Sequence, residues 1–173
     1  AGWNILASSP QRCPGIYPNG HFSVIDLPLA EWARRVKARQ HDGQQQLYDP
    51  VRRRFIARTP EEYVRQALLQ YLLAGKGYSV NRLSVEKMVM VNGLSRRFDI
   101  LIYDHQIQPW LLVECKAPQV ALNDGTFRQA AAYNFALQAP YLAITNGVHT
   151  YCCSIDLETK TYAFLRDFPD FEN

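Results

Sequence analysis

The sequence predicts an α/β sandwich in which helices flank a central mixed β-sheet. Two observations lead to this fold class. Apolar residues recur with a helical period after Thr59, and short apolar runs separated by turn residues follow from residue 83 onward. The elements succeed one another as helix, three meandering strands, helix and strand. This αβββαβ order combines antiparallel neighbours with a helical crossover, which is typical of a mixed sheet.

The composition is that of one globular domain with a core of its own. The chain has 173 residues, of which 47% are hydrophobic and 20% charged. No apolar run approaches the ~18 residues that a membrane span needs, and no signal peptide opens the chain, so we expect no membrane contact. The four cysteines lack CxxC spacing, which favours a reduced, cytoplasmic setting. They are Cys13, Cys115, Cys152 and Cys153.

The start of the chain is predicted to be an arm with a short basic helix, residues 1–40, ahead of the main domain at 41–173. Residues 1–20 are rich in Pro, Gly and small polar side chains, which favours irregular structure. Residues 30–39, AEWARRVKAR, have helical character with a basic face. Residues 41–50 are rich in turn formers and predict a loop.

Basic residues concentrate between positions 34 and 58. Eight Lys and Arg residues stand there against two acidic ones, whereas five acids and two bases follow from Asp156 onward. This asymmetry favours a polyanionic partner near the first third of the chain, with a merely solvated surface as the alternative. The candidate phosphate contacts are Arg52, Arg53, Arg54, Arg96 and Arg97.

The first strong element is a helix from Thr59 to Gly75. Thr59 suits the N-cap, Pro60 suits the first helical position, and Glu62 completes a capping box. Gly75 provides the stop signal. At 100° per residue Glu61 falls on the apolar stripe, so we expect Glu61 to point inward while Glu62 serves the cap.

Three strands joined by two turns are predicted next. Residues 83–91 and 96–104 are apolar runs, and the Asn-Gly pair at 92–93 between them is a strong hairpin signal. A turn at 104–109 then leads into a third strand at 110–116.

A second helix and further strands complete the predicted fold. Residues 124–139 have a helical pattern that starts at an Asp-Gly turn signal. Residues 141–147 predict a fourth strand, and residues 148–156 and 161–165 predict two short strands.

Two carboxylates and an amine are predicted to converge at one edge of the sheet. The turn centred on residues 106–107 puts Asp99 opposite Glu114, and the two-residue period of a strand puts Lys116 on the face of Glu114. Neighbouring carboxylates at the end of an apolar strand repel each other, and a divalent cation would relieve that repulsion. Cys115 alternates to the opposite face and is predicted to be a small core residue.

Oxygen ligands of this kind are those that Mg²⁺ prefers. Asp99, Glu114 and the backbone carbonyl of Cys115 are the candidate ligands. Beside the metal, Lys116 would orient water and stabilise charge on a phosphate. An ordinary exposed ion pair at the end of the strand would also account for the spacing of Glu114 and Lys116. On spacing alone this alternative stays open.

The segments that hold these residues resemble a known group of nucleases. The FD…ECK arrangement, preceded by an acid-bearing helix and followed by RQAAAY, looks like the PD-(D/E)xK nuclease superfamily. More closely, DPVRRRFIARTPEEYVRQALLQYLL, RRFDILIYD, PWLLVECKAP, RQAAAYN and YLAITNG resemble the N-terminal nuclease domain of type I restriction enzyme R subunits, in a stand-alone form. The resemblance covers about residues 22–165. Phe98 stands where the superfamily name has proline, and nothing resembles the ATPase of a complete R subunit.

The resemblance implies a restriction-endonuclease-like fold and DNA cleavage that depends on Mg²⁺, with Mn²⁺ as a substitute. Asp99 and Glu114 match the metal-binding acids of the family, and Lys116 matches its catalytic lysine. Glu61 best matches the acid on the first helix, with Glu62 as the competing assignment.

Two residues of the second helix also match the family. Gln129 and Tyr133 correspond to its QxxxY motif, which implies support of the active site or contact with DNA. They stand one helical turn apart and share a face, so without the resemblance a helix-surface pair is the simpler interpretation.

We therefore predict a metal-dependent DNA endonuclease of restriction or defence type. The expected partners are DNA and other restriction-modification subunits. The alternative is a catalytically silent module that uses the nuclease fold for DNA binding or for assembly of a restriction-modification complex.

Overall fold

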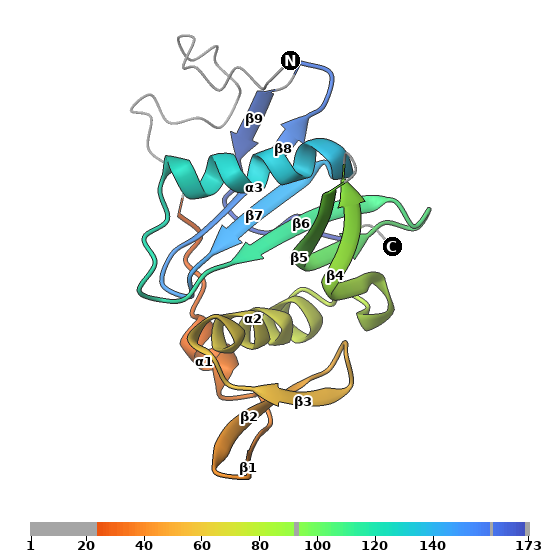
Figure 1. Cartoon of the computed structure of the whole chain (residues 1–173). Helices are drawn as coiled ribbons and strands as arrows, with labels where there is room; N and C mark the ends of the chain where they lie inside the picture. Colours follow the sequence, from red (N-terminus) through yellow and green to blue (C-terminus); the bar gives the residue numbers. More distant parts are fainter. Residues whose placement is uncertain (1–23, 92–93, 160, 172–173) are drawn as a thin grey trace.

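The computed structural model describes residues 24–91, 94–159 and 161–171 (Figure 1). The irregular arm expected over residues 1–20 and the Asn-Gly turn expected at 92–93 therefore lie outside the described residues. No helix in these ranges is long and apolar enough to cross a membrane.

A six-stranded mixed sheet forms the centre of the molecule, as the sequence predicts. Its strands follow the order β4-β5-β6-β7-β8-β9, and only β6 and β7 run parallel. The helix α3, Asp124–Leu137, makes the crossover between these two strands. The strands are β4 Leu83–Val91, β5 Leu94–Tyr103, β6 Pro109–Cys115, β7 Tyr141–Thr145, β8 Thr150–Asp156 and β9 Thr161–Phe164.

Two helices cover opposite faces of this sheet (Figure 1). The helix α2, Pro60–Gln70, packs its apolar stripe on the face that carries Ile100 and Ile102. Helix α3 packs on the face that carries Leu101. Because successive residues of a strand point to opposite faces, β5 contributes to both cores and is buried from both sides.

The N-cap predicted for α2 is confirmed, but the capping box predicted with Glu62 is wrong. The N–H of Thr59 donates to the Ala57 carbonyl, and the Glu62 side chain is bound to Arg52 and Arg65 instead. Thr59 accepts the N–H of Glu62 at 3.0 Å, so Thr59 caps α2. A π-helical turn, Tyr71–Gly75, follows α2 and ends the helical run at the predicted glycine. A short 3-10 turn, Val80–Arg82, then leads into β4.

The segment before α2 differs from the prediction. The helix expected over residues 30–39 is confined to α1, Leu29–Ala33. The loop expected over residues 41–50 is wrong, because this segment belongs to a three-stranded antiparallel sheet. That sheet consists of β1 Ala38–His41, β2 Gln44–Asp49 and β3 Arg54–Ala57.

The physical reason for this miss is the polarity of the small sheet. All residues of β1 are exposed, so the strand shows no alternation of apolar and polar residues. Asp42 and Gly43 have φ angles of +47° and +74°, and this tight turn joins β1 to β2. Figure 1 shows the small sheet on the far side of α2 from the main sheet.

Candidate functional site

The predicted register of β5 and β6 is confirmed. Ile100 lies opposite Val113, and the same register puts Asp99 opposite Glu114 at the next position. The backbone N–H of Cys115 donates to Asp99 Oδ2 at 2.7 Å, so the Asp99 carboxylate is bound to the end of β6. Lys116 Nζ lies 2.6 Å from Glu114 Oε1, which confirms that these two side chains share a face.

The charges of these groups act on one another. Burial and the charge of Asp99 raise the pKa of Glu114, and the contact with Lys116 only partly offsets this. Burial lowers the pKa of Lys116, but the hydrogen bond to Glu114 and the charges of Glu114, Asp99 and Glu61 outweigh burial and raise it. Lys116 is therefore a cation at neutral pH, and Glu61 contributes to the field at the site.

A buried arginine on α2 completes the contacts of Asp99. Arg65 is only 2% exposed, and its Nη2 lies 2.7 Å from Asp99 Oδ1 and 3.0 Å from Glu61 Oε1. Its Nη1 donates to Glu62 Oε2. Burial disfavours the charged guanidinium, but the surrounding carboxylates outweigh burial and raise the pKa of Arg65. The sequence signal that was missed is an arginine one turn after two glutamates in an otherwise apolar helix.

The two helix acids have the opposite burial to that expected. Glu62 is 7% exposed, whereas the side chain of Glu61 is 45% exposed. The side chain of Glu62 is hydrogen-bonded to Arg65, Arg52 and Gln66. The outward position of Glu61 corrects the expectation that it points inward, and its carboxylate remains accessible beside Glu114 and Lys116.

Arg52 extends the same network toward the small sheet. All three of its side-chain nitrogens are bound to carboxylates: Nε lies 2.7 Å from Asp49 Oδ2, Nη2 lies 2.8 Å from Glu62 Oε1, and Nη1 donates to Glu86 Oε2. Gln66 Nε2 donates to the same Asp49 oxygen at 2.9 Å. Arg52, which the sequence suggested as a phosphate contact, is thus engaged within the protein.

Glu86 occupies an irregular position in β4 directly opposite Asp99. The ladder between β4 and β5 pairs Val85 with Ile100 and Lys87 with Phe98, and the intervening pair is missing. Glu86 has a φ of +50°, a left-handed conformation that is uncommon for residues other than glycine. Its carboxylate lies 3.5 Å from Arg65 and 3.7 Å from Arg97. Nothing in the sequence pattern marks this break.

The second helix places its predicted residues together. Gln129 Nε2 donates to Tyr133 Oη at 3.1 Å, so the two side chains form a pair. The ring of Tyr133 packs edge-on against Phe98, which precedes Asp99 in β5, at a centroid distance of 6.5 Å. This contact connects α3 to the strand that carries Asp99.

The remaining candidate residues are three exposed arginines, Arg96 and the buried Cys115. Arg53 and Arg54 are exposed, and the Arg97 side chain is 63% exposed. The side chain of Arg96 lies outside the described residues. Cys115 is fully buried in the core on the α2 side, as expected.

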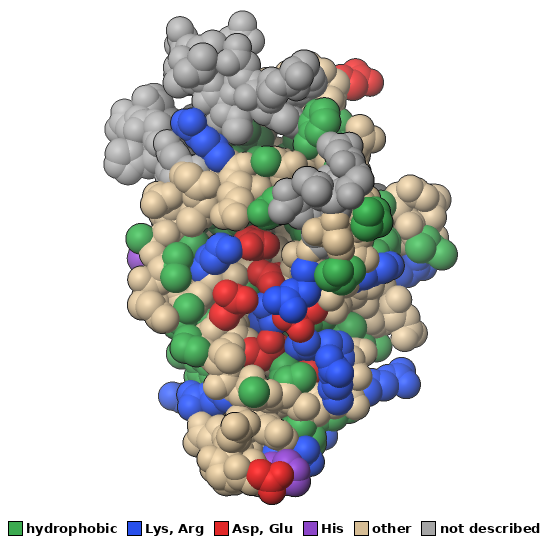
Figure 2. Space-filling view, in the orientation of Figure 1, with side chains coloured by type: hydrophobic (Ala, Val, Ile, Leu, Met, Phe, Trp, Pro, Cys, Tyr) green, Lys and Arg blue, Asp and Glu red, His purple; other side chains and the backbone are tan. Residues whose placement is uncertain are grey.

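Together these contacts form one acidic cluster with a formal charge of −2. Figure 2 shows acidic and basic side chains gathered at the centre of one face of the molecule. Six carboxylates, Asp49, Glu61, Glu62, Glu86, Asp99 and Glu114, meet four cations, Arg52, Arg65, Arg97 and Lys116. Within the part of the chain that the structure describes, no three acidic, His or Cys side chains stand in a metal-binding arrangement.

A divalent cation nevertheless fits the chemistry of the cluster. The donors at Asp99 and Glu114 are carboxylate oxygens, the ligands that Mg²⁺ prefers. Burial and the charge of Asp99 both disfavour the charged form of Glu114 and raise its pKa, and a cation between the two carboxylates would offset both effects. A charge of +2 would also balance the cluster.

The fold and this cluster define an α/β sandwich domain with two acids and a lysine at one edge of a mixed sheet. The family profile described as the N terminus of the type I restriction enzyme R protein (HSDR_N) matches residues 60–169, well over half of the chain. The chain belongs to this family, whose description places it in a restriction system.

The chain is also similar to a solved structure. It is a fragment of a protein assigned as an HsdR subunit of a type I restriction enzyme from Vibrio vulnificus YJ016. The two are 20% identical with a TM-score of 0.44, and the match covers 60% of this chain and 22% of that one. No curated protein matches this sequence significantly.

Proposed function

We propose that the chain is a metal-dependent DNA endonuclease whose active site is the Asp99, Glu114 and Lys116 cluster. The observation that carries this proposal is the cross-strand position of Asp99 and Glu114 with Lys116 Nζ 2.6 Å from Glu114. Membership in the restriction-subunit family supports DNA as the substrate.

Asp99 and Glu114 would hold a Mg²⁺ ion, for which Mn²⁺ would substitute, together with the backbone carbonyl of Cys115. When bound, such an ion lowers the pKa of water and neutralises charge on a phosphate. The hydrogen bond from Cys115 N–H and the contact with Arg65 hold Asp99 in place for this task.

Lys116 supplies positive charge at the point where phosphate charge increases. Its raised pKa keeps it protonated at neutral pH, so it donates hydrogen bonds and does not act as a base. An ammonium group at this place stabilises the pentavalent phosphate and orients the attacking water.

Glu61 is the helix acid best placed to act at the same site. It is more exposed than Glu62, and its charge is felt by both Glu114 and Lys116. The Glu62 carboxylate instead forms ion pairs with Arg52 and Arg65. These observations support assigning the catalytic role to Glu61 and not to Glu62. Gln129 and Tyr133 would support β5 from the other face through Phe98.

Cleavage of supercoiled plasmid with Mg²⁺ or with EDTA tests the proposal. The wild-type chain should nick the plasmid only with Mg²⁺, and Lys116→Ala should slow this by roughly 10²–10³-fold, as loss of a stabilising donor does elsewhere. The matched control is Lys76→Ala, because Lys76 is a lysine paired with Asp167 and Asp170 outside the cluster. No nicking by the wild type would leave the silent module as the better interpretation, and equal nicking by Lys116→Ala would remove its catalytic role.

A further inference from the structure

The segment 34–58, which includes the small β1–β3 sheet, carries the excess of basic residues in this protein. Residues 34–58 hold eight of the 19 basic residues and two of the 16 acidic ones, which gives this segment a formal charge of +6. The rest of the chain holds eleven basic and fourteen acidic residues, a charge of −3. The family match begins only at residue 60, so the segment precedes the matched region.

Within the part of the chain that the structure describes, seven of these eight basic side chains have no acidic partner. Arg52 alone is used inside the acidic cluster. Among the residues that the structure describes, no ion pair involves the other seven, which are Arg34, Arg35, Lys37, Arg39, Arg53, Arg54 and Arg58. Their charge is therefore available to a partner, and burying one against an anion leaves no internal ion pair to break.

Two of these arginines are held in place by uncharged neighbours. Arg39 Nε donates to Gln46 at 2.8 Å, and its guanidinium lies over the Phe55 ring at 4.0 Å. Arg58 Nη1 donates to Gln45 at 2.7 Å, and its guanidinium lies 5.0 Å from the centre of the Tyr63 ring.

Such contacts orient a guanidinium without neutralising it, because an amide oxygen and an aromatic face carry no net charge. The remaining N–H donors of each arginine stay free for phosphate oxygens. A pre-ordered side chain also loses less conformational entropy when it binds a ligand.

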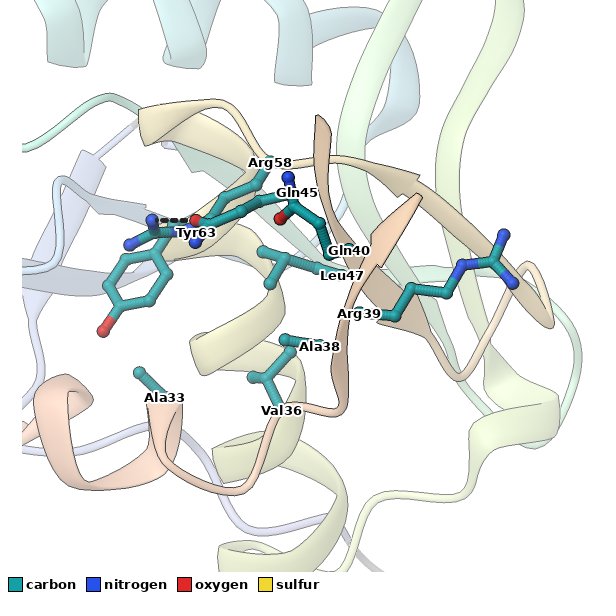
Figure 3. A pocket seen from close by; sticks show the side chains of 9 residues that line it. All are labelled: Ala33, Val36, Ala38, Arg39, Gln40, Gln45, Leu47, Arg58 and Tyr63. Atoms are coloured by element: carbon teal, nitrogen blue, oxygen red, sulfur yellow. Dashed lines mark hydrogen bonds between the residues drawn. The ribbon is translucent and has the colours of Figure 1, made fainter. Parts of the chain in front are cut away.

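The two arginines point to different sides of the small sheet. Arg58, Gln45, Leu47 and Tyr63 line a hollow of about 510 Å³. Arg39 lines it as well, but Figure 3 shows the Arg39 side chain extending away from those of Arg58 and Gln45. The charge thus surrounds the small sheet, and basic side chains flank this end of the molecule in Figure 2.

A series of ion pairs joins this sheet to Asp99. β2 ends at Asp49, which is fully buried and bound to Arg52. Arg52 contacts Glu62, Glu62 contacts Arg65, and Arg65 contacts Asp99. These contacts run without a gap from the end of β2 to Asp99.

We propose that the β1–β3 sheet is a DNA-binding element that grips the phosphate backbone of duplex DNA through its unpaired arginines and Lys37. This proposal rests on the proposed function for the choice of DNA as the ligand. Through the Asp49–Arg52–Glu62–Arg65 connection, the element fixes the position of the duplex against the acidic cluster, which repels phosphates on its own.

Fluorescence anisotropy of a labelled 30-base-pair duplex, in EDTA and over a range of salt concentrations, tests this proposal without any cleavage. Arg39→Gln/Arg58→Gln should weaken binding roughly tenfold or more and lower the slope of log K against log [salt] by about 2, since each phosphate contact contributes about 0.9. The matched control, Lys76→Gln/Arg82→Gln, removes the same charge elsewhere and should bind like the wild type.

Each outcome bears on the proposal separately from cleavage. Equal binding by the Arg39/Arg58 variant and the wild type would overturn the proposal, and so would equal weakening of binding in the control variant. It would also be overturned if poly-glutamate displaced the labelled duplex as effectively, per charge, as unlabelled duplex does. If the wild type does not cut plasmid but still binds duplex more tightly than the Arg39/Arg58 variant, the DNA-binding proposal is supported although the proposed function fails. If the Arg39/Arg58 variant has a lowered melting temperature, Lys37→Gln/Arg54→Gln replaces it. This second variant should lose the same affinity for the duplex, and binding equal to the wild type would again overturn the proposal.

Discussion

Arg65 Nη2 lies 2.7 Å from Asp99 Oδ1, so a buried arginine on α2 holds an acid of β5 at the edge of the main sheet. The contact joins the helix to the strand at the break in the β4–β5 ladder, between Glu86 and Asp99. Because Arg65 also binds Glu61 and Glu62, a single guanidinium sets the positions of three acids.

Replacing this guanidinium should destabilise the fold strongly. Arg65→Met leaves the carboxylates of Glu62 and Asp99 in a poorly solvated place without their cation, which costs about 3–5 kcal/mol. Urea denaturation measures the loss. Arg97→Met is the control, since Arg97 is largely exposed and 3.7 Å from Glu86, and it should cost less than about 1 kcal/mol. Equal losses in the two variants would contradict the role given to Arg65.

The turn after β7 predicts a second stability difference. Gly147 has a φ of +84°, and a Cβ there would lie 3.0 Å from Cγ2 of Val64 on α2. Gly77 has a similar φ of +72° but open space around it. Gly147→Ala should therefore cost more than Gly77→Ala, which carries only the backbone strain of about 1 kcal/mol.

Thermal denaturation of both glycine variants measures this difference, and a double variant identifies its cause. Adding Val64→Ala removes the close methyl group, so it should cost less in the Gly147→Ala background than in the wild type. Strict additivity of the two changes would show that Val64 is not the obstacle.

The buried thiols of β8 predict a loss of stability at alkaline pH. Burial raises the pKa of Cys153 from 9.0 to about 12 and raises that of Cys152 well above its usual value. A group with a raised folded-state pKa contributes stability that is complete below its unfolded pKa and is lost as pH rises toward the folded value. The free energy of unfolding should therefore fall between pH 9 and 12, by up to about 1.4 kcal/mol per pH unit for each thiol.

Unfolding free energies at pH 8 and pH 10.5 test this expectation. Cys153→Ala should reduce the decline between the two values, because one buried titrating thiol is gone. An identical decline in the variant and the wild type would mean that Cys153 does not titrate on unfolding in this range.

The core of the fold could be predicted because its signals are local. Apolar periodicity, Thr59 and the turn residues placed α2, the main strands and α3 to within a few residues. The register of Asp99 against Glu114 followed from the position of one turn. The small sheet could not be predicted in this way, because its first strand is wholly exposed and lacks an alternating pattern.

The wider charge cluster could not be predicted because it depends on tertiary contacts. Arg52, Arg65 and Glu86 come from three separate elements and meet only in the folded chain. The helical angle of Glu61 predicted that it points inward, but α2 instead buries Glu62 against Arg52 and leaves Glu61 partly exposed. Helical periodicity gives the direction of a side chain and not what covers it.

The central claim is that Asp99 and Glu114 hold a divalent cation, and calorimetric titration of the metal-free protein with Mg²⁺, then Mn²⁺, tests it most directly. The wild type should bind with saturation, and Asp99→Asn and Glu114→Gln should each weaken binding by about tenfold or more. Asp167→Asn, which changes an exposed carboxylate paired with Lys76, should bind like the wild type. Binding by Asp99→Asn and Glu114→Gln equal to that of the wild type, or no binding by the wild type, would contradict the claim.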